Sequence, residues 1–238
     1  AEAVVLVLGI SNRIEGEEGG ATQSQWQGDR IRIDLPVIQQ RLVSAIAAKG
    51  TPMVIVLLTG SPLAVPREHE LAKAVLVAWY PGQAGGDAVA ETLFGGANPG
   101  GRLPVTWVRS AEQLPPFTDY AMKGRTYRFL EQEPLYPFGY GLSYTTFAYG
   151  TPRLSAGSVA NGDALDLAVE VRNTGAVAGD EVVQVYLSDR EASVRVARWK
   201  LVGFARVALA PGEAKIVPFS IAARSMAVVD ERGRHVVE

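Results

Sequence analysis

The hydrophobic pattern of the chain changes once, near residue 150, and this change limits the folds that the sequence can adopt. Before it, short apolar runs alternate with segments whose apolar residues recur at helical spacing. After it, apolar residues recur at every second position. Apolar runs are typical of strands covered on both faces, and alternation is typical of strands with one exposed face. We therefore expect an α/β layer with a mostly parallel sheet, followed by an all-β sandwich.

The first half contains the elements of such a layer. Pro36 suits the first turn of a helix, and Gly50 ends that helix. Ile38 and Leu42 lie on one helical face between them. The sequence predicts strands at residues 4–8, 53–58 and 75–79, helices at residues 36–49 and 86–94, and an extended piece at residues 103–107.

The second half follows a segment of different composition. Residues 114–149 are rich in proline, glycine and tyrosine and show no clean period, so we interpret them as a structured aromatic arm. We place the domain boundary near Gly150. Beyond it, the apolar residues from Leu165 to Val171 alternate with smaller or polar ones, which is typical of a half-exposed strand. The sequence predicts strands at residues 165–171, 182–187, 200–208 and 214–221, with turns at residues 173–175 and 211–212.

Composition excludes several classes of function. The chain has 23 lysines and arginines against 25 aspartates and glutamates, without the basic excess that nucleic-acid binding normally needs. No apolar run reaches the ~18 residues of a membrane helix. The absence of cysteine excludes thiolate catalysis, disulfides and cysteine-ligated zinc. The only histidines, His69 and His235, are interpreted as surface or packing residues, and neither a metal nor a cofactor is expected.

An acidic, glycine-rich segment follows the first predicted strand and contains Glu15, Glu17 and Glu18. In open α/β sheets, ligands bind beyond the carboxyl ends of the strands. Repulsion among the three carboxylates should raise the pKa of at least one of them, and a carboxylic acid with a raised pKa suits general acid catalysis. The segment could equally be a solvated acidic loop.

Three further features carry weaker signals. Asp29 and Arg30 could point a carboxylate and a guanidinium at a polyol, or could form an ion pair that ties down their loop. Residues 81–87 are rich in glycine, but their spacing is not that of a dinucleotide-binding loop, so close packing at a helix start is expected. Aromatic side chains could stack on sugar rings or form a packing cluster. They include Trp26, Trp79, Trp107 and the aromatic residues of the segment 117–147.

Taken together, four segments resemble glycoside hydrolase family 3. They are residues 15–30, with Glu15-Gly16-Glu17-Glu18 and Gly28-Asp29-Arg30, residues 78–86, residues 98–106 and residues 134–144. The last two, which read NPGGRLPVT and PLYPFGYGLSY, are long and specific. The all-β part is similar to the fibronectin type III-like domain of that family in residues 173–175, 179–186 and 201–204. The resemblance covers nearly the whole chain.

The resemblance implies a retaining exo-β-glycosidase of the β-glucosidase or β-xylosidase type. Such a mechanism needs two carboxyl groups ~5–5.5 Å apart, a nucleophile and an acid/base. In the family, the nucleophilic aspartate lies in an N-terminal (β/α)8 barrel, which 238 residues cannot hold beside the domains already assigned. We therefore expect a C-terminal portion. Residues 1–149 would be part of the family's α/β sandwich domain, without its opening strands. Residues 150–238 would be an immunoglobulin-like, fibronectin type III-like domain without its last strand.

The resemblance also assigns site residues. Some members carry the general acid/base a few residues before the Gly-Asp-Arg turn, but residues 22–27 of this chain contain no carboxylate. Others carry it in a Gly-Glu-Gly element, to which residues 16–18 are most similar. We therefore favour Glu17 as the acid/base, followed by Glu15 and Glu18. The side chains expected to bind substrate are Trp26, Asp29 and Arg30.

The expected partners are a β-linked oligosaccharide or glycoside and the barrel domain, on the same polypeptide or on a separate chain, and a homodimer stays open. The exposed arm from Phe117 to Tyr149 is a candidate surface for the barrel. The rival hypothesis is a noncatalytic module that binds carbohydrate or acts as a scaffold. A binder of nicotinamide dinucleotide is disfavoured because its glycine-rich fingerprint is absent. The sequence does not distinguish glucose from xylose and does not fix the compartment.

Overall fold

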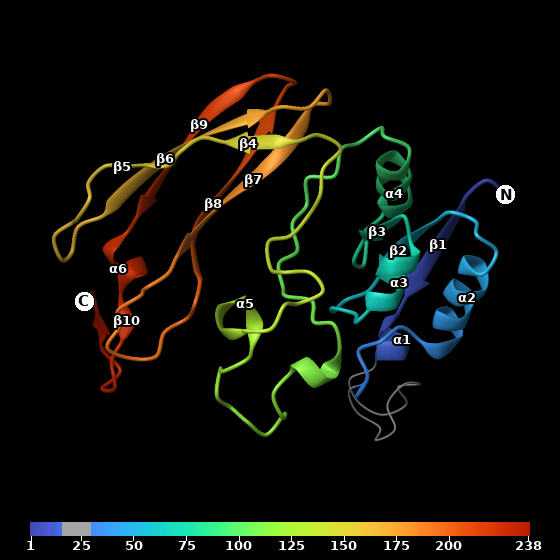
Figure 1. Cartoon of the computed structure of the whole chain (residues 1–238), viewed down its shortest axis with the longest axis horizontal. Coiled ribbons are helices and arrows are strands. Elements are labelled where there is room, and N and C mark those ends of the chain that lie inside the picture. The colour runs from blue at the N-terminus through green and yellow to red at the C-terminus, as the bar shows by residue number, and fades with distance from the viewer. Residues whose placement is uncertain (16–29) are drawn as a thin grey trace. The chain divides into compact units, whose positions relative to one another are not determined.

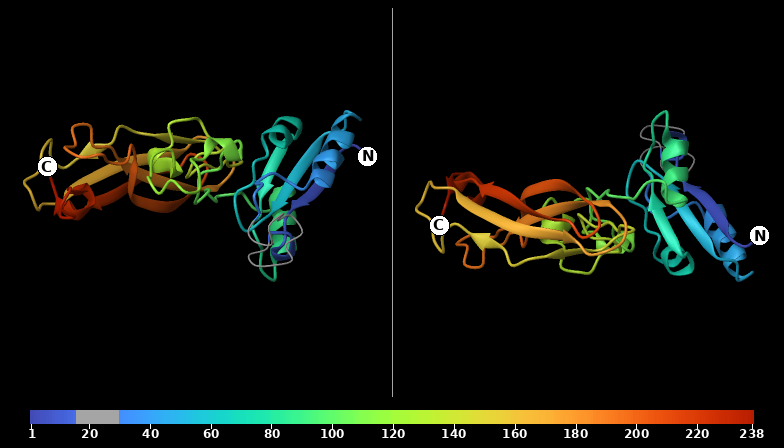
Figure 2. Two further views of the ribbon diagram at one scale, coloured as in Figure 1. Left: turned by 90° about the horizontal axis from the view of Figure 1, so that it is seen from below. Right: turned by 90° about the horizontal axis from the view of Figure 1, so that it is seen from above.

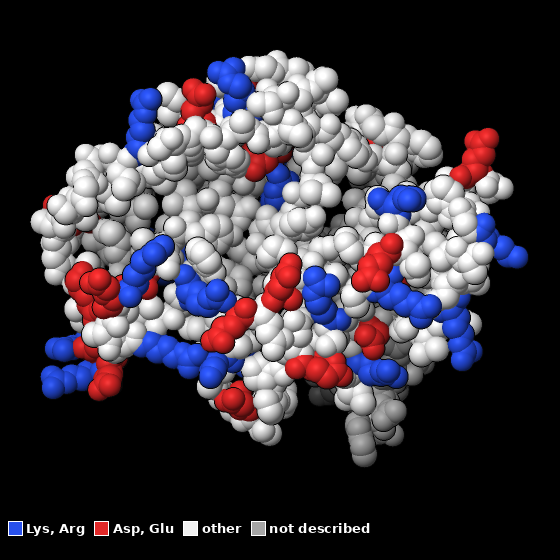
Figure 3. All heavy atoms as spheres, in the orientation of Figure 1, with Lys and Arg blue, Asp and Glu red and all other residues white. Residues whose placement is uncertain are grey.

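The computed structural model describes residues 1–15 and 30–238, and the chain divides into two compact units (Figure 1). Unit 1 consists of Ala1–Gly96, Val105–Arg125 and Leu130–Phe138, and unit 2 consists of Ala97–Pro104, Thr126–Phe129 and Gly139–Glu238. No helix in the described ranges is long and apolar enough to cross a bilayer. Acidic and basic side chains are interspersed on the face that Figure 3 draws, in keeping with a net charge of −2.

Unit 1 is built on a parallel, three-stranded sheet in the order β1-β2-β3. Its strands are β1 (Val4–Gly9), β2 (Met53–Leu58) and β3 (Ala74–Val77). One face of the central strand is covered completely, because Met53, Ile55 and Leu57 are each at most 1% exposed. The three predicted strands are confirmed, although the last one ends earlier, at Val77. On the other face, Val56 of β2 is also buried, whereas Val5 and Val7 of β1 are 48% and 58% exposed, so the predicted covering of both faces does not extend to β1 among the described residues.

Helices accompany the sheet of unit 1. They are α1 (Asn12–Glu15), α2 (Val37–Ala47), α3 (Pro66–Leu71), α4 (Gly85–Leu93) and the 3₁₀ helix η1 (Ala111–Gln113). The predicted helices are present as α2 and α4, while the short α3 was not predicted. The extended piece expected at residues 103–107 is not part of a named strand. Only Trp107 makes a bridge there, an isolated antiparallel one with Tyr136, since prolines such as Pro104 cannot donate to a ladder.

Unit 2 is mostly β-structure. It contains α5 (Thr126–Phe129), β4 (Phe147–Tyr149), β5 (Arg153–Leu154), β6 (Leu165–Asn173), β7 (Gly179–Leu187), β8 (Lys200–Leu209), β9 (Ala214–Ile221), α6 (Ala223–Met226), β10 (Val228–Val229) and β11 (His235–Val236). β6 pairs antiparallel with β4, β5 and β9, and β7 pairs antiparallel with β8. Figure 2 gives two further views of these strands. The four strands predicted for this half are therefore confirmed as β6 to β9.

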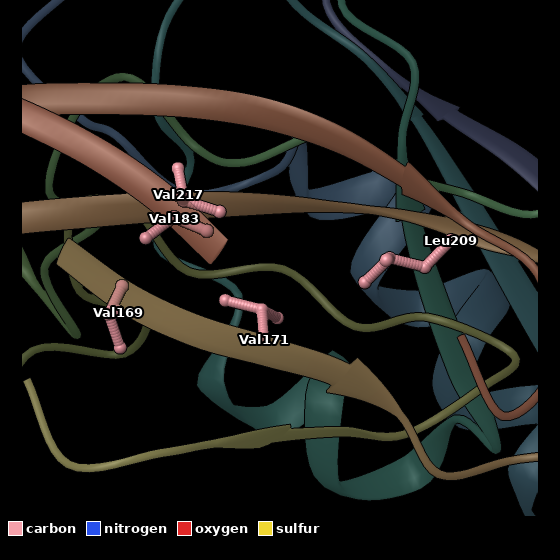
Figure 4. Packing of buried hydrophobic residues seen from close by; sticks show 5 residues of the cluster. All are labelled: Val169, Val171, Val183, Leu209 and Val217. Atoms are coloured by element: carbon pink, nitrogen blue, oxygen red, sulfur yellow. The ribbon is translucent and has the colours of Figure 1, made fainter. Parts of the chain in front are cut away.

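The core of unit 2 lies between these four strands. Val169 and Val171 of β6, Val183 of β7, Leu209 of β8 and Val217 of β9 point toward one another in Figure 4, and each is at most 6% exposed. They come from both sheets, the one that contains β6 and β9 and the β7-β8 pair. The alternation in the sequence thus reflects one face turned to this core.

A polar network ties the segment around Arg102 to the strands of unit 2. Nη2 of Arg102 lies 2.6 Å from Oε2 of Glu181, and these side chains are 11% and 12% exposed. The Tyr149 hydroxyl donates to Oε1 of Glu181 at 2.7 Å. Burial, and then the hydrogen bond to Glu181, raise the pKa of Tyr149 well above its usual range.

This raised pKa predicts a loss of stability in alkali. A tyrosine of the unfolded chain ionises near pH ~10, whereas Tyr149 of the folded chain stays neutral to higher pH. The contribution of Tyr149 to stability is therefore complete below pH ~10, where the tyrosine of the unfolded chain is still neutral. It falls as the pH rises above that value. We expect Tyr149→Phe to show a smaller drop in the urea midpoint between pH 9 and pH 11 than the wild type. Equal drops in the two proteins would contradict this expectation.

Candidate functional site

The carboxyl ends of the three parallel strands of unit 1 bring a cluster of polar side chains together. Glu15 ends α1, which follows β1; Ser61 lies just beyond β2; and Tyr80 lies just beyond β3. Parallel strands end at one edge of their sheet, so these side chains meet although 46 and 65 residues separate Ser61 and Tyr80 from Glu15. Arg30 joins them. This is the edge at which open α/β sheets bind ligands.

The Glu15 carboxylate is the centre of the cluster. Its Oε1 accepts a hydrogen bond from the Ser61 hydroxyl, and its Oε2 accepts one of 2.9 Å from the Tyr80 hydroxyl. Nη2 of Arg30 lies 3.8 Å from Oε1. Because donors face both oxygens, the carboxylate is fixed in orientation and its charge is compensated.

Arg30 is buried more deeply than its partner, since its side chain is 7% exposed against 27% for Glu15. Its Nη2 donates to the Ser61 hydroxyl at 2.7 Å and to the Pro62 carbonyl at 3.2 Å. Burial lowers the pKa of Arg30, and the neighbouring Glu15 carboxylate opposes that shift. Within the described ranges, Nη1 of Arg30 has no hydrogen-bond partner. The guanidinium is thus a charged group held beneath the surface by Ser61 and Pro62.

A glycine allows Tyr80 to approach Glu15. A Cβ atom on Gly60 would lie 2.6 Å from Cε2 of Tyr80 and 3.2 Å from Oε2 of Glu15, which is too close for a real contact to Tyr80. Burial, followed by the hydrogen bond to Glu15, raises the pKa of Tyr80. The Tyr80 hydroxyl therefore stays protonated and remains a donor at neutral pH.

The structure brings together two of the residues that the sequence assigned to the site, Glu15 and Arg30. The other assigned residues, Glu17, Glu18, Trp26 and Asp29, lie outside the described residues. Sequence analysis did not single out Ser61 or Tyr80 as site residues. The signal that could have found them is their position directly after two buried strands.

The glycine-rich segment and one histidine have packing roles. A Cβ on Gly85 would lie 2.4 Å from Cβ of Pro81, so the start of α4 packs closely on its own loop, as predicted. Nδ1 of His69 lies 2.8 Å from the Tyr136 hydroxyl, and the two rings meet edge to face. Neither feature adds a catalytic group to the cluster.

The aromatic residues divide into a buried group and an exposed group. Trp107 is fully buried, and its ring centroid lies 5.9 Å from those of Trp79 and Tyr136. Phe117 and Tyr120, by contrast, are 92% and 88% exposed. Packing therefore accounts for the first group and leaves the second available to a partner or a sugar.

Two family models match the chain. They are the glycosyl hydrolase family 3 C-terminal domain, over residues 1–144, and the fibronectin type III-like domain, over residues 181–238. The β-xylosidase of Formosa agariphila is 42% identical over 243 residues, which cover 100% of this chain and 32% of that protein. The periplasmic β-glucosidase of Salmonella typhimurium is 39% identical over a stretch that covers 93% of this chain and 29% of that protein.

Solved structures are similar over the same extent. A β-glucosidase from Listeria innocua in complex with glucose has a TM-score of 0.85 at 33% identity, with 100% of this chain and 33% of that chain covered. A β-glucosidase from Erythrobacter marinus has a TM-score of 0.83 at 37% identity, with 100% and 31% covered. The chain spans about a third of the length of the curated relatives just described.

Proposed function

Since the chain belongs to glycoside hydrolase family 3, we propose that it acts as the C-terminal portion of a retaining exo-β-glycosidase. The observation that carries the proposal is the similarity along the whole chain to β-xylosidases and β-glucosidases. The proposed substrate is a β-linked oligosaccharide or glycoside, from which the enzyme removes the terminal sugar. Glucose and xylose are the two sugars to test.

The proposed organisation has two domains and one partner. Residues 1–149, with the arm at residues 114–149, form part of an α/β sandwich domain, and residues 150–238 form the fibronectin type III-like domain. The parallel sheet of unit 1 and the apolar core of unit 2 support this division. The partner is a (β/α)8 barrel that carries the nucleophilic aspartate, on the same polypeptide or on a separate chain.

Glu17 is the proposed general acid/base, because the contacts of Glu15 suit a different role. The Glu15 carboxylate faces the hydroxyls of Ser61 and Tyr80 and the guanidinium of Arg30. These contacts engage both carboxylate oxygens of Glu15 with groups of this chain and fix the orientation of the side chain. Glu15 and Glu18 are the alternative acid/bases. Substrate contacts of Trp26, Asp29 and Arg30 stay predictions.

The proposed chemistry needs one proton transfer in each half of the reaction. First, the aspartate of the barrel attacks the anomeric carbon while Glu17 protonates the departing glycosidic oxygen. A covalent glycosyl-enzyme forms, and the rest of the substrate leaves. Glu17, now ionised, then takes a proton from water, which attacks the anomeric carbon and releases the sugar with its configuration retained.

An activity assay of the isolated chain tests whether the nucleophile lies on the barrel and the acid/base on this chain. We expect the purified 238-residue chain to show no turnover of an aryl β-glycoside, because the nucleophile lies elsewhere. Adding the barrel, fused upstream or as a separate chain, should bring activity. Turnover by the isolated chain, in a preparation free of contaminating glycosidase, would refute the placement of the nucleophile on the barrel.

The alternative is a noncatalytic carbohydrate-binding or scaffolding module, which the exposure of Phe117 and Tyr120 favours. If the isolated chain bound a β-linked oligosaccharide and the assembled protein stayed inactive, this alternative would replace the proposed function. Phe117→Ala and Tyr120→Ala should then weaken that binding.

A further inference from the structure

The two described residues that border residues 16–29 are linked to each other. The described chain ends at Glu15 and resumes at Arg30, and Nη2 of Arg30 lies 3.8 Å from Oε1 of Glu15. The Ser61 hydroxyl bridges them, since it accepts a hydrogen bond from Arg30 and donates one to Glu15. This link fixes the separation between the Glu15 and Arg30 side chains.

Tyr80 reaches this link from a strained backbone. The residue before it, Trp79, has a φ of 53°, which is rare for a bulky side chain. Two contacts hold Trp79 there: its carbonyl accepts a hydrogen bond of 3.3 Å from the Thr59 amide, and its ring packs edge-on against the buried Trp107. Such strain persists where the surroundings impose it, and it clusters at functional sites.

Tyr80 contacts Glu15 and contributes little to the core of unit 1. Tyr80 is 49% exposed, so its ring contributes little to a core. Its hydroxyl donates to Oε2 of Glu15, and the raised pKa keeps that proton in place. Gly60 leaves the space in which the Tyr80 ring and the Glu15 carboxylate meet. The arrangement therefore serves the contact with Glu15 more than the stability of the unit.

We propose that Tyr80 and Ser61 are positioning residues, which hold Glu15 against Arg30 and thereby place the start and the end of the segment that carries Glu17. Glu15 is then a positioning residue as well. This inference rests on the proposed function of Glu17, which follows Glu15 by two places in the sequence. Displacement of a reacting group by about 1 Å is enough to lower a rate up to about 100-fold.

The first test needs no catalysis and uses the 238-residue chain. Gly60→Ala places a methyl group against Tyr80 and Glu15, whereas Gly82→Ala places one in open space and is the matched control. Arg30 is 7% exposed, so trypsin should cut after it slowly in the wild type and in Gly82→Ala. We expect cleavage after Arg30 to be about 10-fold faster in Gly60→Ala and in Tyr80→Phe.

Cleavage after Arg32, whose side chain is 70% exposed, is the internal reference and should not change. If Gly60→Ala and Tyr80→Phe are cut after Arg30 at the rate of the Gly82→Ala control, the positioning role is refuted. A rise confined to Arg30 supports it. A rise at Arg32 as well would indicate general unfolding and would also refute it.

The second test uses the complete enzyme and the pH profile of kcat/KM. We expect Tyr80→Phe to lower kcat for an unactivated disaccharide about 10-fold, with KM nearly unchanged and the alkaline limb of the profile retained. In Glu15→Gln the alkaline limb should persist and move to lower pH, because a negative charge near the acid is removed. If the alkaline limb disappears in Glu15→Gln, Glu15 is the acid and the positioning role is wrong.

The two proposals fail separately. Normal activity of Glu17→Gln, together with faster cleavage after Arg30 in Gly60→Ala, would refute the role of Glu17 and leave the positioning of the segment ends supported. Impaired activity of Glu17→Gln, together with wild-type cleavage and wild-type kinetics in Tyr80→Phe, would refute the positioning role alone.

Discussion

Replacing Glu17 by alanine in the complete enzyme should slow the hydrolysis of an unactivated disaccharide by about 10²–10⁴-fold, the usual contribution of a general acid. A sugar leaving group needs a proton as the glycosidic bond breaks, and the variant cannot supply it. The phenolate of an activated aryl glycoside leaves without needing a proton, so the first step with this substrate should be nearly unaffected. Steady-state kinetics on the two substrates, with burst measurements on the aryl glycoside, give the comparison.

Glu15→Ala and Glu18→Ala are the matched controls, because all three carboxylates lie in one acidic segment. We expect smaller losses in both. If Glu17→Ala hydrolyses the disaccharide at the normal rate, the assignment is wrong, and the larger loss among the controls identifies the acid. If none of the three variants is impaired, the segment is a solvated acidic surface.

Replacing Asn173 by alanine should give the largest loss of stability in unit 2, about 3–5 kcal/mol in the free energy of unfolding. Asn173 is fully buried. Its Oδ1 accepts from the Thr145 hydroxyl at 2.6 Å and from the Gly175 amide at 3.0 Å. Its Nδ2 donates to the carbonyls of Val177 at 2.8 Å and Leu209 at 3.0 Å. Alanine would remove all four hydrogen bonds, and two of them, those to the Thr145 hydroxyl and the Leu209 carbonyl, are buried.

Urea denaturation of the chain at neutral pH measures this loss. Asn161→Ala, at an exposed turn position, is the control and should stay within ~0.5 kcal/mol of the wild type. Asn173→Asp keeps the size of the side chain but turns a carboxylate oxygen toward two carbonyls, so it should be no more stable than Asn173→Ala. A loss below ~1 kcal/mol in Asn173→Ala would contradict the account of this network.

The strands of the second half could be predicted because each has one buried face. The alternation around Val169 and Val171 follows directly from side chains that turn toward the core of unit 2. The helix α3 could not be predicted in the same way. It spans only Pro66–Leu71, too short for a helical period to show, and it buries the side chain of Glu68, a residue type that normally marks an exposed position.

The candidate site could be predicted only in part. The position of Glu15 after a buried strand indicates the ligand-binding edge of a sheet, and the structure places it there. Ser61 and Tyr80 come from loops 46 and 65 residues away, and what joins them to Glu15 is the parallel pairing of three strands and the space left by Gly60. A single sequence shows neither the pairing nor that space. The left-handed conformation of Trp79 gives no sequence signal either.

The most direct test of a general acid/base in the segment after Glu15 is azide rescue of the complete enzyme. In Glu17→Ala, the glycosyl-enzyme formed from an activated aryl β-glycoside lacks a base to activate water, and a small anion can take the place of that water. We predict that azide restores turnover and that the product is a β-glycosyl azide, identified by nuclear magnetic resonance. Turnover by Glu17→Ala at the wild-type rate without azide, or no β-glycosyl azide in its presence, would contradict the account.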